Sequence, residues 1–314
     1  MAYAAAPMRA LIVTNMYPSP GQPALGSFVR DQVEALQRIP GLAVEVFAFS
    51  PGGPLAYARA AGELRRRYRL ERFDVVHAHF GLTGWPALAA PGRRRALTLH
   101  GTDLAHPRSR AITLSALRGY DLPAVVSEEL AHEVPTWAVK RSPAVLPCGV
   151  DTNRFHQIGR VEARAKLGLE PRGPYLLFPA DPARSEKRYD RAMEVAGEVP
   201  LLALRGVDPA EVPLWVNAAN AVLVPSEREG FGLSVLEALA CNVPVLGTPV
   251  GIAPEALHGV AGAYCGAFDV NTWHDALAPH LAAADSRVEG RDRAERFSAD
   301  RMAARVAAAW EELS

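Results

Sequence analysis

The strongest candidate for chemistry in this sequence is a segment that runs from Pro225 to Cys241. An apolar, strand-like run ends at Pro225, a turn bracketed by Gly230 and Gly232 follows, and a pattern typical of a helix begins directly after the turn. The first N–H groups of a helix have no partner within the helix, and they carry the positive end of its dipole. The segment therefore predicts a binding site for an anion such as a phosphate group.

Two carboxylates flank this predicted helix start. Glu229 lies just before the turn, and Glu237 lies one turn into the helix. For either residue alone, a non-functional explanation, as a capping acid or a solvated side chain, is as good as a functional one, because an acidic residue near a helix N-terminus is favourable without any function. The pair, placed around an electropositive helix start, favours a ligand site.

A second segment, from Phe178 to Arg188, supplies positive charge. It follows the first predicted strand of the second half of the chain and leads into a helix. Arg184 offers a bidentate fork to a phosphate group, and Lys187 offers a point charge. One basic pair in a loop is weak evidence, but this loop is expected at the same sheet edge as the glycine turn, which strengthens the interpretation.

Several familiar sites are missing. No G-x-G-x-x-G follows a strand, and Gly21 and Gly26 have the spacing of a phosphate loop but are followed by Ser27 instead of lysine, so neither a dinucleotide dehydrogenase nor a P-loop NTPase is indicated. No Asp-x-Asp pair is available to hold a divalent ion on a diphosphate. His77 and His79 share one face of a predicted strand, but no third metal ligand is evident, so a structural or substrate-contacting role is the better interpretation.

The elements that must position these residues alternate between strands and helices. Strands are predicted at 11–14, 42–49, 74–79, 96–99, 124–126 and 144–146 in the first half, and at 175–180, 201–205, 221–225, 244–247 and 262–264 in the second. Helices are predicted at 28–39, 56–70, 187–199, 211–219, 233–241 and 269–284. Apolar strands of this kind belong to parallel sheets covered by helices on both faces.

The domain organisation follows from these elements. A connector rich in Pro, Gly, Asp and Asn at 147–155 is expected to join two doubly wound, Rossmann-like α/β domains that face a ligand cleft. We expect residues 1–150 to form the first domain and 151–300 the second, with a helix in 301–314 that crosses back to the first.

Composition indicates an ordinary globular protein. The chain has 314 residues, enough for two cores, with 49% hydrophobic and 22% charged residues. No run approaches the roughly 18 to 20 apolar residues of a membrane-spanning helix. Three cysteines without C-x-x-C spacing disfavour a disulfide framework or zinc finger, and Met1 to Pro7 does not resemble a signal peptide, so a cytoplasmic protein is expected.

The net charge of zero hides a split between the halves. Residues 1–150 hold 17 basic and 11 acidic side chains, net +6, and residues 151–314 hold 17 and 23, net −6. Arginines cluster at 65–72 and 93–95. Solvated helix faces in an Arg-rich protein are the simpler explanation, and attraction to an anionic acceptor or to the inner face of a membrane is the alternative. A nucleic-acid partner is not expected.

The segment from Glu229 to Glu237 resembles the E-x7-E signature of family 4 of the retaining glycosyltransferases, two-domain enzymes of the GT-B fold. Similar landmarks at 17–34, 74–79, 98–103 and 146–155 extend the resemblance over nearly the whole chain, and the combined pattern is most similar to transferases of the teichuronic acid and exopolysaccharide type. The resemblance implies a metal-independent retaining enzyme without a cofactor. Its substrate would be a UDP- or GDP-linked sugar, from which a hexosyl unit moves to a hydroxyl of a glycan or lipid-linked acceptor.

The same resemblance implies roles for individual residues. Glu237 would accept hydrogen bonds from the ribose hydroxyls, Lys187 would neutralise the diphosphate, and His100 would lie over the donor sugar. The donor-binding set would be Gly26, Arg184, Lys187, Glu229, Gly230, Phe231, Gly232, Leu233, Ser234 and Glu237. The catalytic set would be His100, Glu229, Arg184 and Lys187, with His79, His100 and Asp103 on the acceptor side and no metal ligand.

Two other functions are compatible with such a chain. Nucleotide-sugar 2-epimerases share the two-domain fold, and such an isomerase would alter the donor without an acceptor. A catalytically silent nucleotide-sugar-binding protein would bind the donor without turnover.

Overall fold

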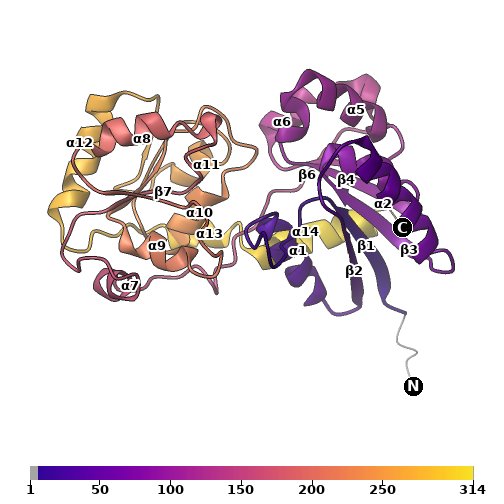
Figure 1. Ribbon diagram of the computed structural model, residues 1–314, viewed down its shortest axis with the longest axis horizontal. Coiled ribbons are helices and arrows are strands. Elements are labelled where there is room, and N and C mark those ends of the chain that lie inside the picture. Colours follow the sequence, from indigo (N-terminus) through magenta and orange to yellow (C-terminus); the bar gives the residue numbers. More distant parts are fainter. Residues whose placement is uncertain (1–5, 314) are drawn as a thin grey trace. The chain divides into compact units, whose positions relative to one another are not determined.

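The computed structural model describes residues 6–313 and divides into two compact units. Unit 1 comprises Met1–Gly149 and Ala299–Ser314, and unit 2 comprises Val150–Ser298. Each unit contains one parallel sheet with helices packed against it (Figure 1). The predicted fold class, α/β with two doubly wound parallel sheets, is confirmed.

Unit 1 is built on a six-stranded sheet in the order β2-β1-β3-β4-β5-β6. Its strands are β1 (Met8–Thr14), β2 (Leu42–Ala48), β3 (Phe73–His79), β4 (Gly92–Leu99), β5 (Leu122–Val125) and β6 (Ala144–Val145). Its helices are α1 (Ser27–Gln37), α2 (Pro54–Arg67), α3 (Gly84–Ala87), α4 (Thr102–Ala105), α5 (Pro107–Leu117), α6 (Glu128–Glu133) and α14 (Ala299–Glu311), with short 3-10 turns η1 (Gly81–Thr83) and η2 (Thr136–Ala138).

Unit 2 is built on a five-stranded sheet in the order β11-β10-β9-β7-β8. Its strands are β7 (Leu176–Phe178), β8 (Leu201–Ala203), β9 (Ala221–Val224), β10 (Val245–Gly247) and β11 (Tyr264–Cys265). Its helices are α7 (Arg160–Lys166), α8 (Tyr189–Ala196), α9 (Val212–Ala218), α10 (Leu233–Ala240), α11 (Ala253–Leu257), α12 (Val270–Ala282) and α13 (Arg291–Glu295), with the 3-10 turn η3 (Ser185–Lys187). Among residues 6–313, no helix combines the length and the apolar character needed to cross a membrane.

Two element boundaries differ from the predicted ones because the backbone turns left-handed there. The helix predicted from residue 187 begins as α8 at Tyr189, since Arg188 has φ 56° and cannot continue the turn before it. The strand predicted at 262–264 begins only at Tyr264, since Gly262 has φ 83°. Both conformations lie outside the helix and strand regions.

The two strand orders share one feature that determines where ligands can bind. In unit 1 the connections leave β1 and β3 toward opposite edges of the sheet, and in unit 2 they leave β7 and β9 in the same way. Loops that diverge from neighbouring parallel strands leave a crevice at the carboxyl ends of those strands. The loops after β1, β3, β7 and β9 are therefore the expected ligand-binding loops of each unit.

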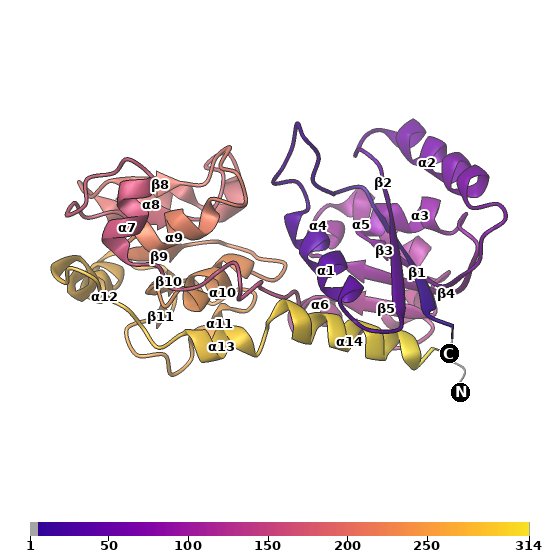
Figure 2. The ribbon, with the colours of Figure 1, turned by 90° about the horizontal axis from the view of Figure 1, so that it is seen from below.

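The C-terminal helix α14 completes the core of unit 1. Its residues Met302, Val306 and Trp310 are buried in the hydrophobic cluster that also holds Ile12 of β1 and Val33 of α1. Figure 2 shows α14 running along the sheet beside α1, so these two helices cover the same face.

We expect Met302→Ala to lower the free energy of unfolding of unit 1 by about 2–4 kcal/mol, because it leaves a cavity under α14. The matched control is Glu311→Ala, at an exposed position of the same helix, which should change the free energy of unfolding by less than about 0.5 kcal/mol. Urea unfolding followed by tryptophan fluorescence measures both. Equal losses in the two variants would mean that α14 does not contribute to this core.

Candidate functional site

A buried ion pair joins the two loops at the crevice of unit 2. Lys187, in η3 after β7, lies with its Nζ 2.5 Å from Oε2 of Glu229, in the loop after β9, and the two side chains are only 14% and 7% exposed. The hydroxyl of Ser226 donates to Oε1 of Glu229 at 2.7 Å. A buried carboxylate needs such partners, so Glu229 is held in one orientation by Lys187 and Ser226.

A third loop, after β10, supports the loop that carries Glu229. The hydroxyl of Thr248 donates to the carbonyl oxygen of Ser226 at 2.5 Å, and the N–H of Ile252 donates to the carbonyl oxygen of Phe231 at 2.7 Å. At Gly251, which has φ 57°, a Cβ would come 2.5 Å from the carbonyl oxygen of Phe231 and 2.8 Å from Cβ of Glu229. Only glycine allows this close approach.

The helix α10 begins at this loop without a side-chain cap. Its N-cap is Gly232, with φ 93°, which has no side chain to bond to the first N–H groups. Glu237 lies in the second turn and is partly exposed, as are Gly230, Leu233 and Ser234. The N-terminus of α10 is therefore free to receive an anion, and a carboxylate lies on the same helix close by.

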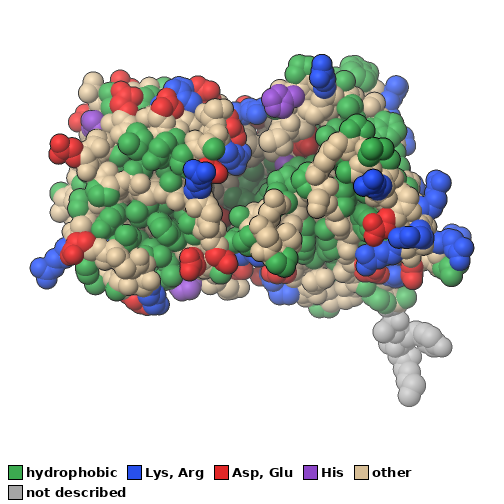
Figure 3. Space-filling view, viewed as in Figure 1, with side chains coloured by type: hydrophobic (Ala, Val, Ile, Leu, Met, Phe, Trp, Pro, Cys, Tyr) green, Lys and Arg blue, Asp and Glu red, His purple; other side chains and the backbone are tan. Residues whose placement is uncertain are grey.

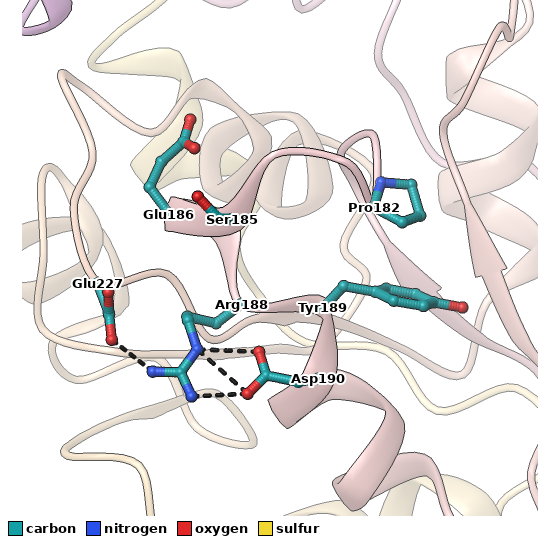
Figure 4. A pocket seen from close by; sticks show the side chains of 7 residues that line it. All are labelled: Pro182, Ser185, Glu186, Arg188, Tyr189, Asp190 and Glu227. Carbon is teal, nitrogen blue, oxygen red and sulfur yellow. Dashed lines mark hydrogen bonds and ion pairs between the residues drawn. The ribbon is translucent and has the colours of Figure 1, made fainter.

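The remaining basic residues after β7 are paired with carboxylates of their own surroundings. Arg184 is half exposed and bonds to Glu186 at 2.7 Å. Arg188, the left-handed N-cap of α8, bonds to Asp190 and Glu227. Figure 4 shows Arg188 between these two carboxylates in an open cavity of about 600 Å³, which is lined by Pro182, Ser185, Glu186, Arg188, Tyr189, Asp190 and Glu227.

These pairings decide what the unit 2 site can do electrostatically. The hydrogen bonds from Arg188 lower the pKa of Asp190 to about 2, so this carboxylate stays charged and keeps Arg188 neutralised. Lys187 has one carboxylate, Glu229, and lies at the loop that precedes the uncapped helix. An incoming phosphate group could replace Glu229 as its partner without leaving a buried cation unpaired.

In unit 1 the loop after β1 ends at a glycine that its fold requires. Gly26, the N-cap of α1, has φ 65°, and a Cβ there would overlap the carbonyl oxygen of Met16. As in α10, no side chain caps the helix. A compact backbone and an uncapped helix start therefore also occur at the crevice of unit 1.

His100 follows β4 and lies among aromatic rings. Its ring centroid is 5.0 Å from that of Phe28 and 4.7 Å from that of Phe80, and it stacks on His79 at 5.3 Å. Phe80 has φ 71°, an uncommon conformation for a bulky residue, and such strain persists only where the surroundings impose it. The rings leave His100 partly exposed at the carboxyl end of the sheet.

Asp103 organises the backbone around His100. Its carboxylate accepts hydrogen bonds from the N–H of Gly81 and from the N–H of His100, both at 2.6 Å. Burial raises the pKa of Asp103, while these two bonds act in the opposite direction. The carboxylate therefore ties the loop after β3 to the loop after β4.

The histidines of this site are neutral. Burial lowers the pKa of His79 to about 3, and burial, with the neighbouring histidines, lowers the pKa of His77 and of His100 well below the usual range. His77 and His79 follow each other on the face of β3 that α1 and α14 cover, and both are fully buried. Among residues 6–313, no group of three or more His, Cys, Asp or Glu side chains is arranged to hold a metal ion.

Sequence reasoning missed several supporting residues. Ser226 and Gly251 contact the Glu229 loop, and Gln32 and Trp310 contact the histidines of β3. The clearest available signal was local: Ser226 lies within the segment singled out from the sequence. The other three come from loops or helices remote in the chain, where no pattern indicates the contact.

Comparisons with known proteins identify the family. The family described as Glycosyltransferase Family 4 matches residues 12–154, and the one described as Glycosyl transferases group 1 matches residues 178–282. A D-inositol 3-phosphate glycosyltransferase of Actinosynnema mirum is 30% identical over 288 residues, with 72% of this chain and 68% of the relative covered. The chain belongs to glycosyltransferase family 4.

Other relatives of this family 4 chain are more distant. A Bacillus subtilis protein named for teichuronic acid biosynthesis, TuaC, is 25% identical over 318 residues, with 78% of this chain and 82% of that protein covered. The D-inositol 3-phosphate glycosyltransferase of Pseudarthrobacter chlorophenolicus is 26% identical, with 68% of this chain covered. The matched region spans 68% of the length of the Actinosynnema relative and 64% of the Pseudarthrobacter one.

Solved structures with the GT-B fold match the family 4 chain over its length. Sucrose-phosphate synthase of Thermosynechococcus elongatus has a TM-score of 0.75 at 19% identity, with 97% of this chain and 99% of that chain covered. HepE of Anabaena, in complex with UDP and glucose, has a TM-score of 0.70 at 15% identity, with 97% and 100% covered. The resemblance and the fold inferred from the E-x7-E segment are confirmed.

The neutral histidines predict how stability depends on pH. A histidine whose pKa is lowered by folding binds fewer protons in the folded state than in the unfolded state. The folded state is therefore fully stable above about pH 6.5, and it loses free energy of unfolding as the pH falls below that value. We expect protonation of His77, His79 and His100 each to lower the free energy of unfolding of unit 1 by about 1.4 kcal/mol between pH 7.5 and 5.5. The melting temperature should fall by about 6 °C or more.

Calorimetry at the two pH values measures this fall. The double variant His77→Gln, His79→Gln should lose most of the pH dependence, while His258→Asn, at an exposed histidine of unit 2, should keep it. A melting temperature that is the same at pH 7.5 and 5.5 would contradict the burial of these imidazoles.

Proposed function

We propose that this chain is a metal-independent retaining hexosyltransferase. Its donor would be a UDP- or GDP-linked sugar, and its acceptor a hydroxyl of a glycan or of a lipid-linked glycan. The observation that carries the proposal is the crevice of unit 2, where the buried pair of Lys187 and Glu229 adjoins the uncapped start of α10 and Glu237 follows on that helix. Helix N–H groups and a cation suit a diphosphate, and a carboxylate suits vicinal hydroxyls.

In the proposed complex each part of the donor has its own partners. Lys187 and Arg184 neutralise the diphosphate, which also accepts hydrogen bonds from the backbone N–H groups of Leu233 and Ser234. The carboxylate of Glu237 accepts hydrogen bonds from the ribose hydroxyls. The sugar ring is held by Glu229 and by the backbone of Gly230, Phe231 and Gly232. HepE, solved with UDP and glucose, shares the fold, and this supports a nucleotide sugar as the ligand.

Lys187 exchanges partners in this proposal. In the unliganded chain Glu229 keeps its charge compensated, and a bound diphosphate would take over that role. Glu229 would then be released to accept hydrogen bonds from sugar hydroxyls. After the exchange Lys187 is paired with the diphosphate, and the Glu229 carboxylate accepts hydrogen bonds from Ser226 and the sugar hydroxyls, so neither charge is left without a partner.

The chemistry would depend on stabilising the leaving group. The bond between the anomeric carbon and the diphosphate oxygen breaks, and the negative charge that develops on the diphosphate faces Lys187 and the N-terminus of α10. The acceptor hydroxyl attacks from the same face, and its proton passes to a donor phosphate oxygen. At the crevice of unit 1, His100 would serve the acceptor side, with the buried His79 and Asp103 holding it in place, and Gly26 would keep the backbone of its loop compact.

We also propose that unit 1 contacts an anionic membrane surface. Arg65, Arg66 and Arg67 form the last turn of α2, and the exposed Leu55 and Leu70 lie at its two ends. Figure 3 shows Lys and Arg side chains gathered over the part of unit 1 where α2 leads into β3. Cationic and exposed apolar side chains together favour the headgroup region of a membrane that carries lipid-linked acceptors.

A ligand screen followed by product analysis tests the function. Thermal-shift measurements with nucleoside diphosphates should reveal one base that stabilises the protein by about 2.7 kcal/mol at 100 times its Kd. The corresponding sugar donor, offered with candidate acceptors in the presence of EDTA, should give a product with retained anomeric configuration by NMR. A donor isomerised without acceptor would instead indicate an epimerase, and binding without turnover a silent binding protein.

The two glutamates are expected to affect different steps. Glu237→Gln keeps the shape of the side chain but removes charge-assisted hydrogen bonds, so the affinity for the nucleoside diphosphate should fall roughly 10- to 150-fold. Glu229→Gln should not lower this affinity, because Lys187 then loses a competing carboxylate, but the variant should have a lower kcat with the intact donor. Calorimetric titration and initial rates measure the two effects, with Glu255→Gln, at an exposed position of α11, as the control. If both substitutions have small and equal effects, the two carboxylates only stabilise the start of the helix and do not bind the donor.

Membrane contact should depend on the arginines of α2. Replacing Arg65, Arg66 and Arg67 by Gln removes three cations worth about 1 kcal/mol each at an anionic surface, so binding to vesicles should fall about 100-fold. Co-sedimentation with vesicles of phosphatidylglycerol and phosphatidylcholine measures this, and Arg172→Gln, at an exposed position of unit 2, serves as the control. Binding that is indifferent to lipid charge would refute the contact.

A further inference from the structure

The hydrogen bonds of His77 determine which of its ring nitrogens carries the proton. Nε1 of Trp310 in α14 lies 3.1 Å from Nδ1 of His77, and an indole N–H can only donate. Nδ1 of His77 must therefore be unprotonated, and its proton lies on Nε2, which is 2.7 Å from the hydroxyl of Thr98. His77 is held as a neutral imidazole in one tautomer.

His77 stacks on His79, which is bonded to His100. The rings of His77 and His79 lie 4.7 Å apart at 20°, and Nδ1 of His79 lies 3.0 Å from Nε2 of His100. Because both members of this second pair are neutral, one proton lies between them. Either His79 donates and His100 carries its own proton on Nδ1, or His100 donates through Nε2 and its Nδ1 is a lone pair.

Gln32 of α1 distinguishes the two arrangements. Its side-chain amide nitrogen approaches Nε2 of His79 at 3.5 Å, in a site where both residues are buried. Because an amide nitrogen can only donate, this contact, at the outer limit of hydrogen-bond length, favours an unprotonated Nε2 in His79. The proton of His79 is then on Nδ1, from which it is donated to His100.

We propose that His79 is a positioning residue that holds His100 in the tautomer protonated on Nδ1, and that Trp310, through His77, keeps His79 in place. The chain of contacts runs from the C-terminal helix α14 to the partly exposed ring of His100. Each step is a directional hydrogen bond or a ring stack, and all members except His100 are fully buried. Such a chain leaves little freedom in the orientation of His100.

The tautomer decides what His100 can do for a ligand. In the tautomer proposed, Nδ1 is an N–H donor, which can bond to a hydroxyl or phosphate oxygen but cannot accept a proton from a hydroxyl. His100 therefore orients an oxygen of the substrate and does not act as a general base. This consequence rests on the proposed function, whereas the tautomer itself is a property of the free protein.

NMR of the unliganded full chain tests the tautomers directly. Long-range ¹H–¹⁵N correlation spectra of ¹⁵N-histidine-labelled protein at neutral pH distinguish a protonated Nδ1 from a protonated Nε2, and single histidine variants assign the signals. We expect the proton on Nδ1 in His100 and on Nε2 in His77. A His100 protonated on Nε2 would overturn the proposal, whatever the activity of the chain.

Variants then test whether His79 positions His100. His79→Leu removes the bond, so the His100 signals should become those of a tautomer mixture, and kcat should fall about tenfold with little change in the donor KM. His79→Asn places an amide N–H where Nδ1 was, and should restore both the tautomer and most of kcat. His258→Asn, at the exposed unit 2 histidine, is the control.

Trp310→Phe tests the far end of the chain. It keeps an aromatic ring but removes the N–H donor, so the His77 signals should lose their single tautomer and kcat should fall less than in His79→Leu. Melting temperatures show whether these changes in tautomer and kcat come only from a loss of stability. If both variants lower the melting temperature but leave the His100 tautomer unchanged, the residues are only structural and the proposal is wrong. If the tautomers respond as expected and no donor is turned over, the proposed function fails while this inference stands.

Discussion

The order of strands in the two parallel sheets is the constraint on which the rest of the structure depends. In each unit the chain leaves two neighbouring strands toward opposite edges, β1 and β3 in unit 1 and β7 and β9 in unit 2. The loops that follow these strands cannot cover each other, so they leave open backbone, helix starts and polar side chains at one edge. Gly26, Lys187 and Glu229 all lie in such loops, and so does Gly232, the uncapped start of α10.

Buried polar groups are stabilised differently in the two units. In unit 2 the charges are kept and paired, as Lys187 is with Glu229. In unit 1 the imidazoles of His77 and His79 give up their charge, because burial lowers their pKa values. A paired charge can exchange its partner for an anionic ligand, whereas a neutral imidazole offers a directional donor or acceptor. The first property suits a charged donor and the second suits the orientation of a hydroxyl.

Much of the fold was predictable because near-continuous apolar runs and turn residues are local signals. The predicted strands lie within a few residues of those observed, and the helix after Gly232 begins where its pattern does. Two of the errors occur where the backbone becomes left-handed, at Arg188 and Gly262, which periodicity does not reveal. Others are shifts of three or four residues, as in β4, which begins at Gly92 and not at residue 96. Among the candidate site residues, Lys187 and Glu229 meet, but Arg184 bonds to Glu186 of its own turn, a contact that composition and spacing did not indicate.

The sequence by itself determined the family, the two parallel sheets and the E-x7-E segment, because these depend on residues close together in the chain. Only the tertiary structure decided the surroundings of those residues. Trp310 bonds to His77 across 233 positions, and Gln32 reaches His79 across 47. No local pattern encodes such contacts. They arise because α1 and α14 bury their apolar faces on the same side of one sheet, and this burial brings single polar groups together.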